Sequence, residues 1–286
     1  MPASTDATNR VSGRRDAIEL GQRLFFDTRI SGDGRFSCGT CHVPERNWTD
    51  NRTRGFAAAE AERNTPTLMN LRLGRLFGWT GASDTLWKQS IRPMLDAREL
   101  GASAAHVAKL VRTDDQLACR YRKTFGVPSV DDGLVLSDVA KALAAFQETF
   151  ETPPTPFDRF RDALARGAPS TYPDSARRGL KTFVANCSSC HSGPNFTNGE
   201  LRDNGFTHEG RFKVPTLRHL MLTAPYGHHG RIETIADVVR HYSERGSEAL
   251  KPLKLTAAQQ SDLVVFLESL STLSNPWRAE DHGECH

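Results

Sequence analysis

Cys38-Gly-Thr-Cys41-His42 and Cys187-Ser-Ser-Cys190-His191 are the two stretches that decide the fold of this 286-residue chain. In a C-x-x-C-H motif, two cysteines form thioether bonds to a heme and the histidine becomes an axial ligand of its iron. One copy could arise by chance or be half of a zinc or redox site. Two copies with similar flanks predict two covalent hemes c.

The sequences around the two motifs repeat each other. Cys187 lies 149 residues after Cys38, and each motif is preceded by a Gly-x-x-x-Phe segment, at Gly21–Phe25 and Gly179–Phe183. Trp48-Thr-Asp follows the first motif as Phe196-Thr-Asn follows the second. This pattern predicts two copies of one heme-binding unit.

The periodic segments are helical, and no run of alternating residues indicates a sheet. Helices are expected at 15–25, 103–125, 136–150 (with Ser137 as N-cap), 175–184, 234–242 and 256–270. The proline-rich stretch Glu151–Pro156 is typical of a linker. The predicted fold is therefore mainly α, with two cytochrome c-like domains at 1–155 and 156–286, each carrying one covalent heme c.

Composition excludes several classes of function. The 37 basic and 34 acidic side chains give a net charge of only +3, which four heme propionates would cancel, so neither nucleic acid nor an anionic membrane is an expected partner. Mean hydropathy is −0.50, and no apolar run approaches the roughly 18 residues of a membrane span.

The compartment is expected to be the periplasm, because heme c is attached outside the bacterial cytoplasm. The polar start, Met1-Pro-Ala-Ser-Thr-Asp, has no apolar region of a signal peptide, which is consistent with a mature chain. Cys119 and Cys285 lie outside the motifs. They either form a disulfide or remain as a buried thiol and a reactive terminal thiol.

Several ordered motifs together resemble the bacterial diheme cytochrome c peroxidase and MauG superfamily, over about Ala17 to Gly246. They are LGQRLFFDTRISGDGRFSCGTCH, RNTPTLMN, FGWTG, LWKQSIRPMLDARELG, CSSCH and FKVPTLRHLMLTAPYGHHGRIETIADVVRHY. The resemblance implies a high-spin heme on His42 with an open distal face, which reacts with hydrogen peroxide. It implies a six-coordinate, low-spin heme on His191.

The resemblance places the second axial ligand of the low-spin heme at Tyr242, where peroxidases of the superfamily have Met and the MauG-like branch has Tyr. Alternatively, Tyr242 is an ordinary helix aromatic and His241 is the ligand, or there is none. A phenolate oxygen stabilises oxidised iron more than a thioether does, which suits storage of oxidising equivalents.

Trp79 matches the tryptophan that carries electrons between the hemes, although a lone Trp is more often part of a core. Gln89, Pro93 and Glu99 match the distal pocket, where the carboxylate could move a proton between peroxide oxygens. The alternative for Glu99 is a solvated charge at a helix end. Asn51 to Arg63 contains no histidine, unlike the distal loop of the peroxidases.

Asn64, Thr223 and Pro225 match a calcium site between the hemes, with one side-chain oxygen, two carbonyls and waters as ligands. The alternative is that they only form turns. His228 is expected near the low-spin heme, and Trp277 is either an exit point for oxidising equivalents or a packing residue.

The expected function is oxidation of tryptophan in a partner protein, to kynurenine or a Trp-derived quinone, by a MauG- or MbnH-type enzyme. Hydrogen peroxide would bring both hemes to a state that is formally Fe(IV)–Fe(IV). The alternatives are a periplasmic peroxidase that takes electrons from a small cytochrome, and a diheme electron carrier without chemistry of its own.

Overall fold

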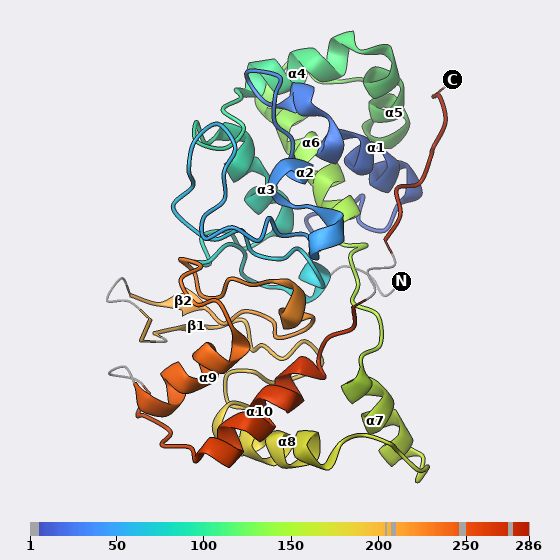
Figure 1. The fold of residues 1–286 in the computed structure, drawn as a ribbon. Helices are drawn as coiled ribbons and strands as arrows, with labels where there is room; N and C mark the ends of the chain where they lie inside the picture. Colours follow the sequence, from blue (N-terminus) through green and yellow to red (C-terminus); the bar gives the residue numbers. More distant parts are fainter. Residues whose placement is uncertain (1–5, 204, 207–209, 246–249, 274–276, 286) are drawn as a thin grey trace.

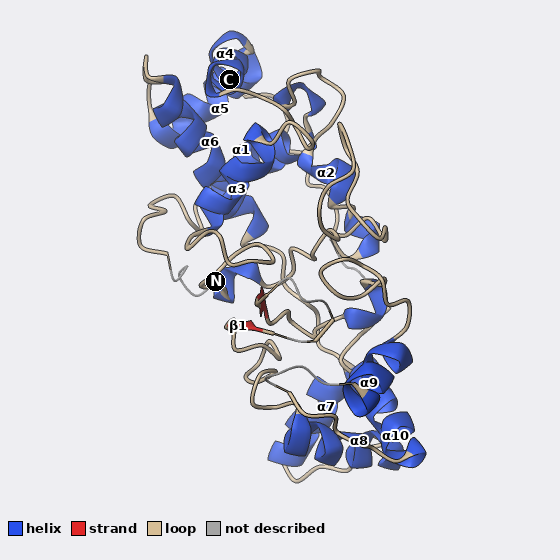
Figure 2. Cartoon of the chain, turned by 90° about the vertical axis from the view of Figure 1, so that its left-hand side faces the viewer, coloured by secondary structure: helices blue, strands red, loops and turns tan. Residues whose placement is uncertain are grey.

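The computed structural model describes residues 6–203, 205–206, 210–245, 250–273 and 277–285. Residues 1–5 and 286, at the outer limits of the predicted domains, lie outside this set. Helices gather at the two ends of the molecule, and loops with a small sheet lie between them (Figures 1 and 2). The α-helices are α1 (Arg15–Phe26), α2 (Cys38–Cys41), α3 (Leu86–Leu95), α4 (Ala104–Thr113), α5 (Asp115–Phe125), α6 (Asp132–Gln147), α7 (Pro156–Ala165), α8 (Asp174–Asn186), α9 (Ile235–Glu244) and α10 (Ala257–Glu268). The mainly helical prediction is confirmed.

The same helix crossing occurs in both halves. Helix α1 crosses α6 at Gly21, where an added Cβ would lie 2.1 Å from the Ala142 carbonyl oxygen. Helix α8 crosses α10 at Gly179, where the corresponding distance to the Asp262 carbonyl is 2.0 Å. Only glycine allows such close approach, so the repeated Gly-x-x-x-Phe segments mark one crossing used twice. We call α1–α6 the first unit and α7–α10 the second unit.

Two predicted helices differ from the observed ones. Asp114 divides the expected 103–125 helix into α4 and α5, because its side chain accepts a hydrogen bond from Leu117 N and begins a new helix. Helix α6 begins at Asp132 with Asp131 as its N-cap. Ser137 is not the cap, since its hydroxyl donates to the Gly133 carbonyl one turn earlier.

Two helices and a pair of short strands were not expected from the sequence. Helix α7 begins inside the proline-rich stretch because Pro156 takes the first helical position, after a capping box between Thr155 and Asp158. Helix α3 contains Pro93, and because proline usually ends a helix, no helix was predicted there. Strands β1 (Leu201–Arg202) and β2 (Phe212–Lys213) form a two-residue antiparallel pair.

The C-terminal tail returns from the second unit to the first, along α1 and α5 (Figure 1). Cys119 and Cys285 form a disulfide with Cα atoms 5.9 Å apart, which resolves the alternatives left open by the sequence. Trp277 packs against the core of the first unit.

The boundary between the two domains at residues 155 and 156 remains a prediction. Among the described residues, no helix is both long and apolar enough to cross a membrane.

Candidate active site

Each motif histidine is oriented by a backbone carbonyl. His42 Nδ1 lies 2.9 Å from the Trp48 carbonyl oxygen, and His191 Nδ1 lies 3.0 Å from that of Phe196. Trp48 and Phe196 both adopt the left-handed backbone conformation, with φ of 62° and 51°. A bond at Nδ1 fixes the tautomer and leaves Nε2 available to a metal, as in many metal-binding histidines.

The four motif cysteines are free thiols, whereas Cys119 and Cys285 are bonded to each other. Burial raises the pKa of Cys38 to about 12, and the charges of Cys41 and Glu99 add to the rise. Two thiols and one oriented imidazole in each unit are the donor set that heme c requires. Glu99 also raises the pKa of Cys41, so its charge acts on both thiols of the first motif.

Helix α3 carries Gln89 and Pro93, and Glu99 lies in the turn that follows it. Burial raises the pKa of Glu99, and the charge of Asp96 raises it further. The Gln89 Oε1 atom is buried without a hydrogen-bond partner, next to Gly78. Pro93 lies inside α3 and has no N–H to donate to the carbonyl four residues earlier.

A loop that covers Cys41 is tied to the segment that carries Glu99. The amides of Ala58 and Ala59 donate to the carbonyls of Glu99 and Arg98, at 3.4 and 2.9 Å. Within the loop, the Ala61 amide donates to the Gly55 carbonyl at 2.8 Å. The loop is therefore held in place by backbone bonds.

The spacing of 149 residues between the motifs also identifies equivalent positions in the two units. Trp79 is equivalent to His228, and Pro93 is equivalent to Tyr242. Trp79 and His228 meet at the junction of the two units, where the backbone amide of Asn64 donates to the His228 carbonyl at 2.9 Å. The matching Lys213 amide donates to the Trp79 carbonyl at 2.7 Å. The helix position of Tyr242 is thus occupied in the first unit by a proline, which has no side-chain donor.

Tyr242 lies within electrostatic range of the second motif. Burial raises its pKa, and the charges of Cys187 and Cys190 raise it further. The neighbouring His241 ring packs against Phe206, with centroids 4.3 Å apart.

Trp79 lies at the junction of the units. Its indole N–H donates to the Asn64 carbonyl at 2.8 Å, and its ring centroid is 6.4 Å from that of His228. His228 is buried and stacks on Phe212 at 3.5 Å. Both rings are thus held by backbone or ring contacts between the two motifs.

The three predicted calcium ligands lie in adjoining segments. The side-chain nitrogen Nδ2 of Asn64 donates to the Arg52 carbonyl at 2.7 Å, so its Oδ1 is the side-chain atom that a cation could bind. The adjacent Asn51 amide donates to the carbonyls of Leu222 and Ala224, the latter at 2.8 Å, next to Thr223 and Pro225. In the described part of the chain, no cluster of three or more His, Cys, Asp or Glu residues could hold a metal ion. Amide and carbonyl oxygens would therefore be the ligands, which suits a hard cation.

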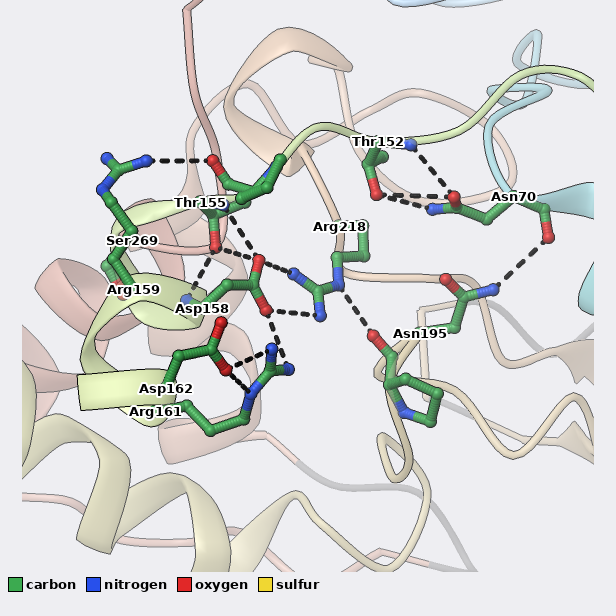
Figure 3. Close-up of polar contacts among 12 residues, drawn as sticks. Asn70, Thr152, Thr155, Asp158, Arg159, Arg161, Asp162, Asn195, Arg218 and Ser269 are labelled. Carbon is green, nitrogen blue, oxygen red and sulfur yellow. Dashed lines mark hydrogen bonds and ion pairs between the residues drawn. The ribbon is translucent and has the colours of Figure 1, made fainter. Parts of the chain in front are cut away.

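A buried ion pair that was not predicted from the sequence supports the loop behind His191. Arg218 and Asp158, each 6% exposed, form two hydrogen bonds, one of them 2.9 Å long. Arg218 Nε also donates to the Pro194 carbonyl at 2.7 Å, and its guanidinium lies 5.2 Å from the centre of the Phe196 ring. Figure 3 shows Arg218 between Asp158 and this loop, with Asn195 reaching Asn70 of the first unit.

A signal for Arg218 was present in the repeat. The segments Pro66–Asn70 and Pro215–His219 match, and in both a threonine hydroxyl donates to the carbonyl of an asparagine, at 2.7 Å. Arg218 therefore stands at the position equivalent to Met69 in the first unit. A charged residue at a position that is apolar in the other copy indicates a buried partner.

Comparison with known proteins agrees with this architecture. Residues 15–165 match the family described as di-haem cytochrome c peroxidase (CCP_MauG), and residues 176–271 match cytochrome c. The chain belongs to the di-haem cytochrome c peroxidase and MauG family. As a member of this family, it is a heme-dependent oxidoreductase of the peroxidase type that acts on hydrogen peroxide.

Relatives of this family member cover most of its length. The methylamine utilization protein MauG of Methylorubrum extorquens is 33% identical, covering 89% of this chain and 78% of the relative. The cytochrome c551 peroxidase of Nitrosomonas europaea is 28% identical, covering 90% and 80%. A crystal structure of a MauG-like protein associated with microbial copper homeostasis has a TM-score of 0.81 and 25% identity, over 97% of both chains.

Proposed function

We propose that this peroxidase-family enzyme uses hydrogen peroxide to oxidise a tryptophan of a partner protein in the periplasm. The observation that carries the proposal is the difference between matching helix positions. Pro93 offers no ligand in the first unit, whereas the matching position of the second unit carries a phenol, Tyr242, whose pKa responds to the charges of Cys187 and Cys190. One iron would stay open to peroxide and the other would be closed.

Two hemes c, when bound, would supply the two-electron reduction of hydrogen peroxide. Cys38, Cys41 and His42 would hold the first, and the matching second set is Cys187, Cys190 and His191, with Tyr242 as the further ligand. The imidazoles are suited to this role because burial lowers the pKa of both, which favours the neutral form.

Glu99 would take the proton from one peroxide oxygen and return it to the other, so that water leaves. Burial supports this role, because a raised pKa brings the carboxyl nearer to the working pH. The unpartnered Gln89 Oε1 could accept a hydrogen bond from bound peroxide. Pro93 would leave room for it.

Trp79 would pass electrons between the units. Its ring is fixed by the bond to the Asn64 carbonyl and lies at the junction of the repeat. Calcium at Asn64, Thr223 and Pro225 would brace the same junction, since Asn64 holds both the indole and the Arg52 carbonyl. Removal of calcium should therefore slow electron exchange between the units.

Tyrosine at position 242 favours oxidation of a protein over reduction of peroxide with electrons from a small cytochrome. An anionic oxygen ligand stabilises ferric iron and makes the second heme a poor electron acceptor. The Cys119–Cys285 disulfide supports an oxidising compartment.

Spectroscopy and mass spectrometry test the proposal together. The ferric enzyme should show one high-spin and one low-spin EPR signal, and one equivalent of peroxide should remove both without added reductant. A protein co-expressed from a neighbouring gene should gain oxygen at a tryptophan only when the active enzyme is present. Rapid turnover with a reduced small cytochrome, with no modified protein, would instead establish the peroxidase alternative.

A further inference from the structure

Two indole rings connect the His42 loop to the C-terminal tail. Trp48 is 1% exposed, and its carbonyl is the atom that orients His42. Its ring stacks on Phe150 at 3.6 Å and meets the Trp277 ring edge-on, with centroids 5.1 Å apart. Trp277 is only partly buried. A continuous path of aromatic contact therefore runs from the histidine loop toward solvent.

Among its described residues, the second unit shows no such pair of indoles. Phe196 occupies the place of Trp48, and its carbonyl orients His191. Its ring contacts are with Phe157, Phe183 and Phe266. Indole loses an electron far more readily than a benzene ring, so Phe196 is a much poorer electron donor than Trp48.

The tail that carries Trp277 is fastened by polar and covalent contacts. Gln22 Nε2 donates to the Glu280 carbonyl at 2.8 Å, and Arg120 donates to the Gly283 carbonyl. The Cys285 amide donates to Gln116 Oε1 at 2.7 Å, beside the disulfide to Cys119. These contacts fix the tail downstream of Trp277, so the indole stays against Trp48.

We propose that Trp48 and Trp277 form a relay that carries single electrons from the surface to the heme on His42. The Cys119–Cys285 disulfide keeps the outer indole in contact. The inference rests on heme attachment at His42 from the proposed function, but it requires no partner protein.

The electrons and atoms of this relay balance. Reduction of peroxide consumes two electrons and two protons and releases two waters. Trp277 gives up one electron through Trp48, loses its indole proton to solvent, and is restored by an electron and a proton from an outside donor. Without a donor, Trp277 loses two electrons and gains one oxygen atom from water, so the net reaction is Trp plus peroxide to oxidised Trp plus water.

The experiment treats the diheme holoprotein with peroxide in the absence of donor or partner, and maps oxygen addition by peptide mass spectrometry. Freeze-quench EPR follows tryptophan radicals. We expect oxygen at Trp277, and a loss of about tenfold or more of this product in Trp48→Phe, although Trp277 is still present. Trp277→Phe should remove the corresponding radical signal.

Trp87 is the matched control. It is also partly buried against the first core, but its N–H donates to the Thr8 hydroxyl and its ring lies near Lys88 and Lys141. It should gain little oxygen, and Trp87→Phe should leave oxidation of Trp277 unchanged. The double variant Cys119→Ser/Cys285→Ser, which leaves the core intact, should lower the yield at Trp277.

Equal oxygen addition at Trp87 and Trp277 would indicate a diffusing oxidant and overturn the relay. An unchanged yield of oxidised Trp277 in the Trp48→Phe variant would also overturn the relay. If Trp48→Phe does not fold, an unchanged yield in the disulfide variant overturns it instead. In both cases the heme signals still respond to peroxide, and the proposed function stands. Heme signals that ignore peroxide reject the proposed function and the relay together.

Discussion

Replacing Arg218 by Met, the residue at the matching position of the first unit, should destabilise the second unit strongly. The substitution leaves Asp158 buried at 6% exposure without its main partner. Although burial opposes ionisation, hydrogen bonds from Arg218 and Thr155 lower the Asp158 pKa from 3.8 to about 2. At about 1.4 kcal/mol per pKa unit, this corresponds to roughly 2.5 kcal/mol of folding free energy, shared among these bonds.

Removing one partner of a buried pair commonly costs about 3–5 kcal/mol. Asp158 keeps its bonds to Thr155 and a weaker ion pair with Arg161, so we expect a loss of about 2–4 kcal/mol. The Asp158 pKa is lowered in the folded state, so its stabilisation is present above about pH 4 and disappears as pH falls toward 2. The difference between wild type and variant should shrink over the same range.

Urea unfolding at pH 7 and at pH 3, followed by heme absorbance, measures this difference. The matched control is Arg161→Met, which removes a pair to the same carboxylate from an arginine that is 50% exposed. It should cost no more than about 1 kcal/mol. Because Arg218 also holds the Pro194 carbonyl, Arg218→Met should alter the low-spin EPR signal and leave the high-spin signal unchanged. Equal costs for the two variants would refute the assignment of Arg218 as the buried partner.

Glu99→Gln should slow the reaction with peroxide by about 10²–10⁴-fold in stopped-flow measurements, because the proton carrier is lost. Burial raises the Glu99 pKa above its usual 4.5, so the wild-type rate of reaction with peroxide should fall as the pH drops through this raised pKa. A rate that does not change with pH contradicts this role. Tyr242→Phe should abolish the low-spin EPR signal, and an unchanged signal excludes the phenol as a ligand. Gly21→Ala and Gly179→Ala should each lower the free energy of unfolding in urea by about 1–3 kcal/mol or more, because a Cβ would overlap a carbonyl of the crossing helix. The control Lys181→Ala, on the exposed face of α8, should be nearly neutral.

The sequence predicted the features that depend on local pattern. The C-x-x-C-H motifs specify heme c by themselves, and the glycine at each helix crossing lies in a visible repeat. Helix α9 was expected at 234–242 from its periodicity, and the observed helix begins at Ile235 with Thr234 as its N-cap. Such signals lie within a few residues of the structure they determine.

Features that depend on contacts between distant segments could not be read in this way. Cys119 and Cys285 are 166 residues apart, and only the path of the tail brings their Cα atoms to 5.9 Å. Arg218 and Asp158 are 60 residues apart, and Asp158 lies in a helix hidden by surrounding prolines. The repeat marks Arg218 as unusual, but nothing local identifies Asp158 as its partner or pairs Cys119 with Cys285.

The two units share a backbone but differ at the positions that matter for oxidation, and the differences are mutually consistent. Under the proposed function, Pro93 leaves the first iron open, whereas Tyr242 closes the second. A phenolate oxygen favours positive charge on the second iron. An oxidising equivalent that resides there has an indole route to the surface through the first unit, whereas Phe196 behind His191 packs against three phenylalanine rings. The first unit would therefore both admit peroxide and, through Trp48 and Trp277, release its oxidising power, while the second unit would store one equivalent until it is needed.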